Sequence, residues 1–175
     1  CKLALQSDVN YNNGDYSSPP KKGLKAFSRN YTSTLFDKEG YEEGLHLNLF
    51  DGFEDTESYL NFMDSFFGSI DANDLLGMLN TWQMGDIGKH EKFNNNTKKA
   101  LANINCPALV MPSSTDLSFP ARNNIPEVKG MPNAELKVIN TKHGHLAGGM
   151  STTLTSQEDV AFIDKNIREF LKKIT

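Results

Sequence analysis

Two short apolar runs in the C-terminal half of the chain constrain the fold more than any other feature. The first begins the segment 108–116, the second begins the segment 137–145, and each segment ends in polar residues. The connection between them passes through residues 120–128 and is long enough for a helix. A strand, a helix and a second strand in this order are typical of two parallel strands in an α/β protein. We therefore predict the α/β class.

Two parallel strands do not form a viable sheet alone, because parallel sheets are covered by helices on both faces and flanked by further strands. With 175 residues, 38% of them hydrophobic and 23% charged, the chain is globular with a lean core. We therefore expect a fragment or subunit whose sheet is completed by a segment outside this chain. We expect a helical region over residues 1–104 and a β-α-β-α segment over residues 105–175.

Ahead of the strands, apolar residues recur at intervals of three and four, which is typical of helices with one buried face. We predict a helix around residues 24–35, a second capped by Thr56, a third opened by Asp71 and a short one capped by Thr97. A last helix begins with a capping box at residues 156–159. Its apolar stripe consists of Val160, Ile163, Ile167, Phe170, Leu171 and Ile174.

Charge and hydropathy exclude two classes of partner. The formal net charge is −4 and no basic run occurs, which argues against nucleic-acid binding. No stretch approaches 18 consecutive apolar residues, so we expect no membrane span. We expect a cytoplasmic protein, although Asn30 and Asn95 begin glycosylation acceptor patterns that leave secretion open.

The polar residues after the two runs include a candidate acid and a candidate base. Asp116 follows the first run and His145 follows the second, and functional groups of α/β sheets gather at the carboxyl ends of strands. Asp followed by His matches the order of the triad acid and base in α/β-hydrolases. Singly, each could be an ordinary turn residue, and His143 competes for the role of base. His46 and His90 are expected to be structural or surface residues.

A nucleophile for such a triad is missing. The chain contains neither a G-x-S-x-G elbow nor an HGGG-type oxyanion segment. Ser113 and Ser114 lack the strand–turn–helix context of an elbow, and Cys1 begins a segment that resembles the end of a helix. Metal chemistry is not expected either, because no third ligand accompanies His143 and His145 at a spacing suited to zinc.

Several segments of the chain, taken in order, resemble those of one enzyme family. Residues 4–8, 13–16, 19–20 and 22–24 resemble the segment that enters that family's helical lid, and residues 67–74 resemble a helix start in the lid. Residues 106–111 with Thr115, Asp116 and Phe119 resemble its acid-bearing strand. Residues 131–136 followed by Gly144 and His145 resemble its last strand and catalytic histidine. The chain thus resembles the homoserine O-acetyltransferase-like family of α/β-hydrolases.

The resemblance implies the C-terminal part of an α/β-hydrolase: the lid, the last two strands and the final helix. Asp116 would be the triad acid and His145 the triad base. The serine, the oxyanion hole and the central sheet would lie on an N-terminal chain or segment, in a heterodimer that proteolytic processing could produce. The substrate would be a small-molecule ester or alcohol, without a cofactor, and acetyl-CoA would be a co-substrate only in a transferase.

Two departures from the family pattern bear on the substrate. The Arg-Gly-rich turn is replaced by Gly88 and Lys89, and Leu146 stands where the transferases have an Asp directly after the catalytic histidine. A less polar substrate than homoserine is therefore expected. Apolar lid residues would line its pocket, with core packing as the alternative: Phe62, Phe66, Met78 and Trp82. The function expected is ester hydrolysis or O-acetyl transfer, and the competing class is a non-catalytic binding or scaffold protein that lacks the nucleophile.

Overall fold

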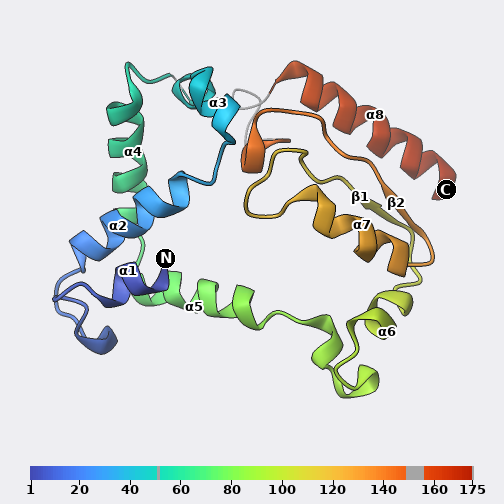
Figure 1. The fold of residues 1–175 in the computed structure, drawn as a ribbon, viewed down its shortest axis with the longest axis horizontal. Coiled ribbons are helices and arrows are strands. Elements are labelled where there is room, and N and C mark those ends of the chain that lie inside the picture. Colours follow the sequence, from blue (N-terminus) through green and yellow to red (C-terminus); the bar gives the residue numbers. More distant parts are fainter. Residues whose placement is uncertain (51, 149–155, 175) are drawn as a thin grey trace. The chain divides into compact units, whose positions relative to one another are not determined.

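The computed structural model describes residues 1–50, 52–148 and 156–174, which fall into two compact units (Figure 1). One unit contains residues 1–34 and 52–85, and the other contains residues 35–50 together with the described residues from 86 onward. The division at residue 104 that the sequence suggests stays a prediction.

The first unit is helical. Its elements are α1 (Lys2–Gln6), the 3₁₀ turn η1 (Asn12–Gly14), α2 (Lys21–Thr32), α4 (Thr56–Gly68) and α5 (Ala72–Met84). Helix α2 packs against α1 and α4. Leu24 and Phe27 on α2 are buried, as their spacing predicts, and the Phe27 ring meets Phe67 edge-on at a centroid distance of 5.2 Å.

The helix caps correct the sequence prediction at two positions. Asp55 rather than Thr56 caps α4, because the Asp55 carboxylate accepts from the Ser58 amide at 2.7 Å and the Ser58 hydroxyl accepts from the Asp55 amide at 3.1 Å. Asn96 rather than Thr97 caps α6 (Thr97–Ala102). Asp71 caps α5 as predicted, by accepting from the amides that follow it.

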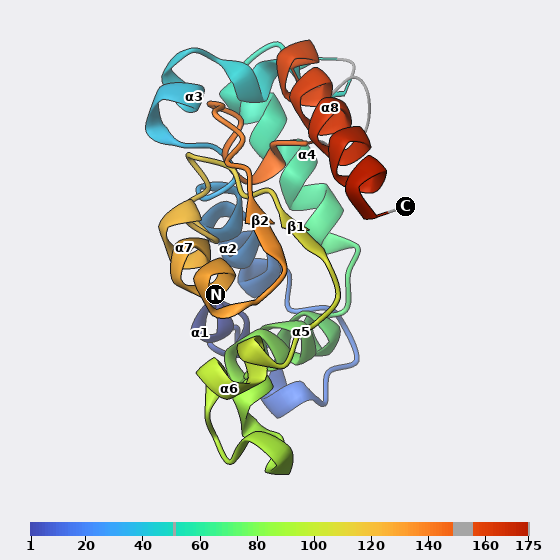
Figure 2. The same ribbon diagram turned by 90° about the vertical axis from the view of Figure 1, so that its right-hand side faces the viewer.

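The second unit contains the strands. Its remaining elements are α3 (Lys38–Glu42), η2 (Leu45–Asn48), η3 (Ile87–Lys89), η4 (Glu91–Phe93), β1 (Ala108–Val110), α7 (Ala121–Gly130), β2 (Ala134–Leu136), η5 (Gly144–Leu146) and α8 (Gln157–Ile174). Strands β1 and β2 pair in parallel, with Ala108 opposite Ala134 and Val110 opposite Leu136. Figures 1 and 2 show α7 and α8 on opposite sides of this pair. The predicted α/β arrangement is confirmed.

The second strand begins earlier than the apolar run suggests. β2 covers Ala134–Leu136, and the pairing reaches the predicted run only as an isolated parallel bridge between Ser113 and Ile139. The Ile139 amide donates to the Pro112 carbonyl at 2.8 Å, and the Ser114 amide donates to the Ile139 carbonyl at 2.8 Å. The two segments that follow the strands therefore stay hydrogen-bonded as far as Ser114 and Ile139, and their polar residues come directly after this point.

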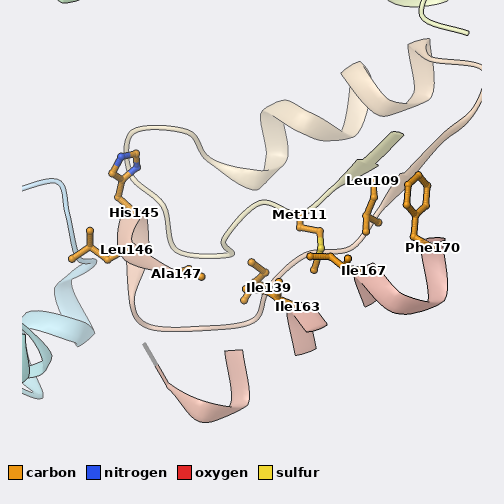
Figure 3. A pocket seen from close by; sticks show the side chains of 10 residues that line it. Leu109, Met111, Ile139, His145, Leu146, Ala147, Ile163, Ile167 and Phe170 are labelled. Carbon is orange, nitrogen blue, oxygen red and sulfur yellow. The ribbon is translucent and has the colours of Figure 1, made fainter. Parts of the chain in front are cut away.

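Burial around the strands is lower than predicted. The residues of β1 and β2 are half-buried, and the stripe of α8 is exposed by 38–49% at Val160, Ile167, Leu171 and Ile174. An apolar groove of about 640 Å³ lies between the strands and α8 (Figure 3). It is lined in part by Leu109, Met111, Ile139, Ile163, Ile167 and Phe170.

Helix α8 begins and ends close to its predicted bounds. Ser156 accepts from the Asp159 amide at 2.9 Å through its side-chain oxygen, which is the capping bond expected at the start of this helix. Within the described ranges, no helix combines the length and apolar character needed to cross a membrane.

Candidate active site

Asp116 and His145 meet beyond the ends of the paired strands. The His145 Nδ1 lies 3.0 Å from the Asp116 Oδ2, and the two side chains are 25% and 11% exposed. The strand ladder explains their meeting, because the bridge from Ser113 to Ile139 starts both polar segments at the same level of the sheet. The structure thus brings the predicted acid and base together.

The Asp116 carboxylate is held by its own turn. Its Oδ1 accepts from the amides of Ser118 and Phe119 at 2.7 and 2.9 Å, while its Oδ2 faces the imidazole. With the carboxylate as acceptor, the His145 Nδ1 carries a proton, and Nε2 is the nitrogen free to accept one. This geometry matches the orienting acid and general base of a nucleophilic triad.

The loop that carries His145 depends on the glycine before it. Gly144 has a φ of +55°, and a Cβ atom there would approach the Leu35 carbonyl oxygen to 2.5 Å. The His145 amide donates to the same carbonyl at 2.8 Å. A residue without a side chain is therefore required next to the base. Gly148 also has a positive φ of +82°, and Gly149 lies outside the described residues.

The other histidines have different surroundings. His143 Nδ1 faces the Thr141 hydroxyl at 3.0 Å and not Asp116, so the geometry favours His145 as the base. His46 is 3% exposed, and burial lowers its pKa, which keeps it neutral. His90 accepts from the Lys92 amide through Nδ1 and caps a 3₁₀ turn. His46 is thus buried and His90 exposed, in line with the expected structural or surface roles.

The two serines near Asp116 are engaged with the loop backbone. Ser113 Oγ accepts from the Thr115 amide at 3.3 Å, and Ser114 Oγ donates to the Thr141 carbonyl at 3.2 Å. These bonds give both hydroxyls a role in holding the loops. In the described part of the chain, no three His, Cys, Asp or Glu side chains gather as a metal site would require.

A cavity of about 270 Å³ opens beside the pair, and its lining includes Ser113, Asp116, Phe119, Asn124 and His145. The Phe119 ring lies 5.6 Å from the His145 ring, centroid to centroid, at an interplanar angle of 33°. No site role was predicted for Phe119 or Asn124. The one sequence signal for Phe119 was its resemblance, together with Asp116, to the acid-bearing strand of the family.

The predicted apolar pocket residues lie in the helical unit. Phe62 and Phe66 are on α4, Met78 and Trp82 are on α5, and their exposed fractions run from 39% to 53%. Phe66 also packs within the unit, with its ring 5.1 Å from that of Phe67, so core packing stays the alternative. Their role in substrate binding stays a prediction.

Comparisons with known proteins place the chain among esterases and acyltransferases. No family model matches it. A probable esterase from Corynebacterium glutamicum is 33% identical over 96% of this chain, and an ethyl acetate hydrolase from Pseudomonas veronii is 32% identical over 82%. A homoserine O-acetyltransferase from Chloroherpeton thalassium is 26% identical over 82% of this chain.

Solved structures agree with these sequence matches. An acetylester hydrolase from Corynebacterium glutamicum superimposes with a TM-score of 0.86 at 32% identity over 98% of this chain, and an acetyl esterase with 0.85 at 29% identity over the same share. The chain spans less than half the length of each of these relatives. The shares are 47%, 41% and 38% of the three proteins above and 48% of each of the two structures.

Proposed function

Because the chain belongs to the α/β-hydrolase superfamily, in the group of esterases and homoserine O-acetyltransferases, we propose that it supplies the acid and the base of a Ser–His–Asp triad in an ester hydrolase. The observation that carries this proposal is the 3.0 Å contact between His145 Nδ1 and Asp116 Oδ2. The two amides on Asp116 Oδ1 support it, because they fix the carboxylate that orients the imidazole.

The reaction is acyl transfer through a serine ester. His145 Nε2 takes the proton of the serine hydroxyl as the oxygen attacks the ester carbonyl, and the same nitrogen then gives that proton to the leaving alcohol. Water enters next, loses a proton to Nε2 and attacks the acyl-enzyme. The bond to the serine oxygen then breaks, Nε2 returns the proton to that oxygen, and the acid is released. Asp116 stabilises the imidazolium formed in both steps and keeps its own charge.

Hydrolysis is favoured over transfer to homoserine by the residue after the base. Leu146 offers an apolar side chain at the position where the Asp of the transferases would face the ammonium group of an amino-acid acceptor. Esterases are also more similar to this chain, at 33% and 32% identity against 26% for a transferase. The substrate is therefore an ester of a small, apolar alcohol or acid, and acetyl-CoA is not needed.

The serine belongs to a segment N-terminal to this chain, which also supplies the central sheet. The half-buried strands, the groove beside them and the exposed stripe of α8 support this, because a further part of the sheet and its helices would cover them. We further propose that this segment and the present chain form a heterodimer after proteolytic processing.

Turnover of 4-nitrophenyl acetate by the complete protein, with the upstream segment present, tests the proposal. We expect His145→Ala to lower kcat by about 10³-fold or more while the protein stays folded. His90→Ala, which removes an exposed imidazole from a turn, is the matched control and should leave kcat unchanged. Full activity of His145→Ala would contradict the assignment of the base. A complete protein without an upstream G-x-S-x-G segment and without turnover would instead be a non-catalytic binding or scaffold protein.

A further inference from the structure

A second histidine–carboxylate cluster lies near the pair of His145 and Asp116, and it consists of Thr141, His143 and Asp159. Thr141 Oγ1 donates to Asp159 Oδ2 at 2.7 Å and lies 3.0 Å from His143 Nδ1, and that nitrogen is 3.4 Å from the same carboxylate oxygen. The cluster is enclosed, since the side chains of His143 and Asp159 are 18% and 5% exposed. It joins the loop that carries His145 to the first turn of α8.

The hydrogen bonds define where the protons lie. The single hydroxyl proton of Thr141 is used in the bond to Asp159, so Thr141 Oγ1 can only accept from its other neighbours. One of these is the His143 amide at 3.2 Å, and the other is His143 Nδ1. Nδ1 of His143 is therefore the protonated nitrogen, and Asp159 is the carboxylate on which the cluster converges.

The backbone of Thr141 connects the same cluster to the loop that carries Asp116. Its carbonyl accepts from the hydroxyls of Ser114 and Thr115 at 3.2 and 2.8 Å, and its amide donates to Ser114 Oγ at 3.1 Å. Thr115 Oγ1 in turn accepts from the Gly144 amide at 3.2 Å. Thr115 and Gly144 are the immediate neighbours of Asp116 and His145, so Thr141 ties the acid loop to the base loop.

We propose that Thr141, held by Asp159 and His143, is a positioning residue that keeps His145 in register with Asp116. This inference deepens the proposed function and rests on it for its effect on turnover. Such a role has a large consequence, because a displacement of about 1 Å at reacting groups can cost about 10²-fold in rate. The Thr141 hydroxyl carries this role, because it bonds the Asp159 carboxylate, the His143 amide and His143 Nδ1.

Replacing that hydroxyl in the complete protein provides the test. Thr141→Val keeps the shape and the backbone bonds and removes only those of the hydroxyl, and we expect kcat for 4-nitrophenyl acetate to fall by about 10–100-fold with KM within about 2-fold. Thr141→Ser keeps the hydroxyl and should restore kcat to within about 3-fold of the original. Thr97→Val is the matched control, because it loses a bond to Asp86 away from the site. Equal kcat in the Val and Ser variants, or a loss of activity in proportion to unfolded protein, would overturn the proposal.

Nitrogen-15 NMR of the histidine rings separates this inference from the proposed function. In the original protein we expect His143 as the Nδ1–H form and a hydrogen-bonded Nδ1 proton on His145. Thr141→Val should shift that His145 proton and speed its exchange with water, whereas Thr141→Ser should not. Asp159→Ala removes the partner on the other side and should act like Thr141→Val. An unchanged His145 signal in both variants overturns the positioning role. A responsive signal in a protein without turnover refutes the proposed function alone.

Discussion

At the scale of single residues, the site is distinguished by which carboxylate each histidine meets. His143 and His145 are two positions apart, yet one faces Asp159 through Thr141 and the other faces Asp116 directly. Only the second pair borders the cavity beside Phe119. The pair at the cavity is therefore the one whose geometry suits proton transfer, and the other pair contacts Thr141.

Gly144 is the residue whose replacement tests the loop most directly. We expect Gly144→Ala to destabilise the protein by about 1–3 kcal/mol and to lower turnover, because a Cβ at a φ of +55° would collide with the Leu35 carbonyl. Thermal denaturation and the ester assay measure the two effects. Gly77→Ala is the control, since nothing lies within 4 Å of a Cβ there and helix α5 should gain up to about 1 kcal/mol. Similar losses in both variants would refute the role of Gly144.

The contact between Asp116 and His145 was predictable from the sequence. The cluster of Thr141, His143 and Asp159 was not. Each of the first two follows an apolar run, so the sequence alone places them at adjacent strand ends. The bond from Thr141 to Asp159 crosses from a loop to a separate helix, and no periodicity signals such a contact. Phe119 was missed for a similar reason, because a ring's direction depends on the turn that Asp116 caps.

At the scale of elements, the sequence patterns predict that a helix or strand exists better than they predict its first residue. Asp55 and Thr56 are both good cap residues ahead of the same apolar pattern, and the extended backbone of Asp55 decides between them. The start of β2 at Ala134 was displaced from the apolar run because Glu135 interrupts the hydrophobic pattern. Its carboxylate pairs with Lys173 of α8 at 2.7 Å, so a charge is tolerated in the strand.

The cap of α4 makes a prediction with a built-in comparison. We expect Asp55→Ala to lower the melting temperature by about 2–4 °C at neutral pH and Thr56→Ala to change it much less. Hydrogen bonds from Ser58 lower the pKa of Asp55, so its contribution is present above the usual carboxyl range and is lost as the pH falls through the lowered value. The difference between Asp55→Ala and the original protein should therefore vanish in strongly acidic solution. A larger effect of Thr56→Ala would restore Thr56 as the cap.

At the scale of the whole molecule, two observations support the proposed covering segment. They are the exposed apolar surface of the strand-bearing unit and the greater length of the relatives. The chain spans 47% of a probable esterase and 48% of an acetylester hydrolase structure. Its strands have the parallel pairing that proteins bury on both faces, yet they are half-buried here. The apolar stripe of α8 predicted a buried face, and its exposure in this chain supports the proposal of a covering segment.

Helix α8 allows a test of that covering segment. Ile167 is 42% exposed and lines the groove beside the strands. In the complete protein we expect Ile167→Asp to reduce the free energy of unfolding by about 2–4 kcal/mol, because a charge would be buried under the rest of the sheet. Ala161→Asp introduces the same side chain at an exposed position outside the apolar stripe, and its effect should stay within about 0.5 kcal/mol. Urea denaturation of both variants gives the comparison. Equal and small effects would mean that the groove stays open to solvent in the complete protein, and the proposal of a covering N-terminal segment would fail.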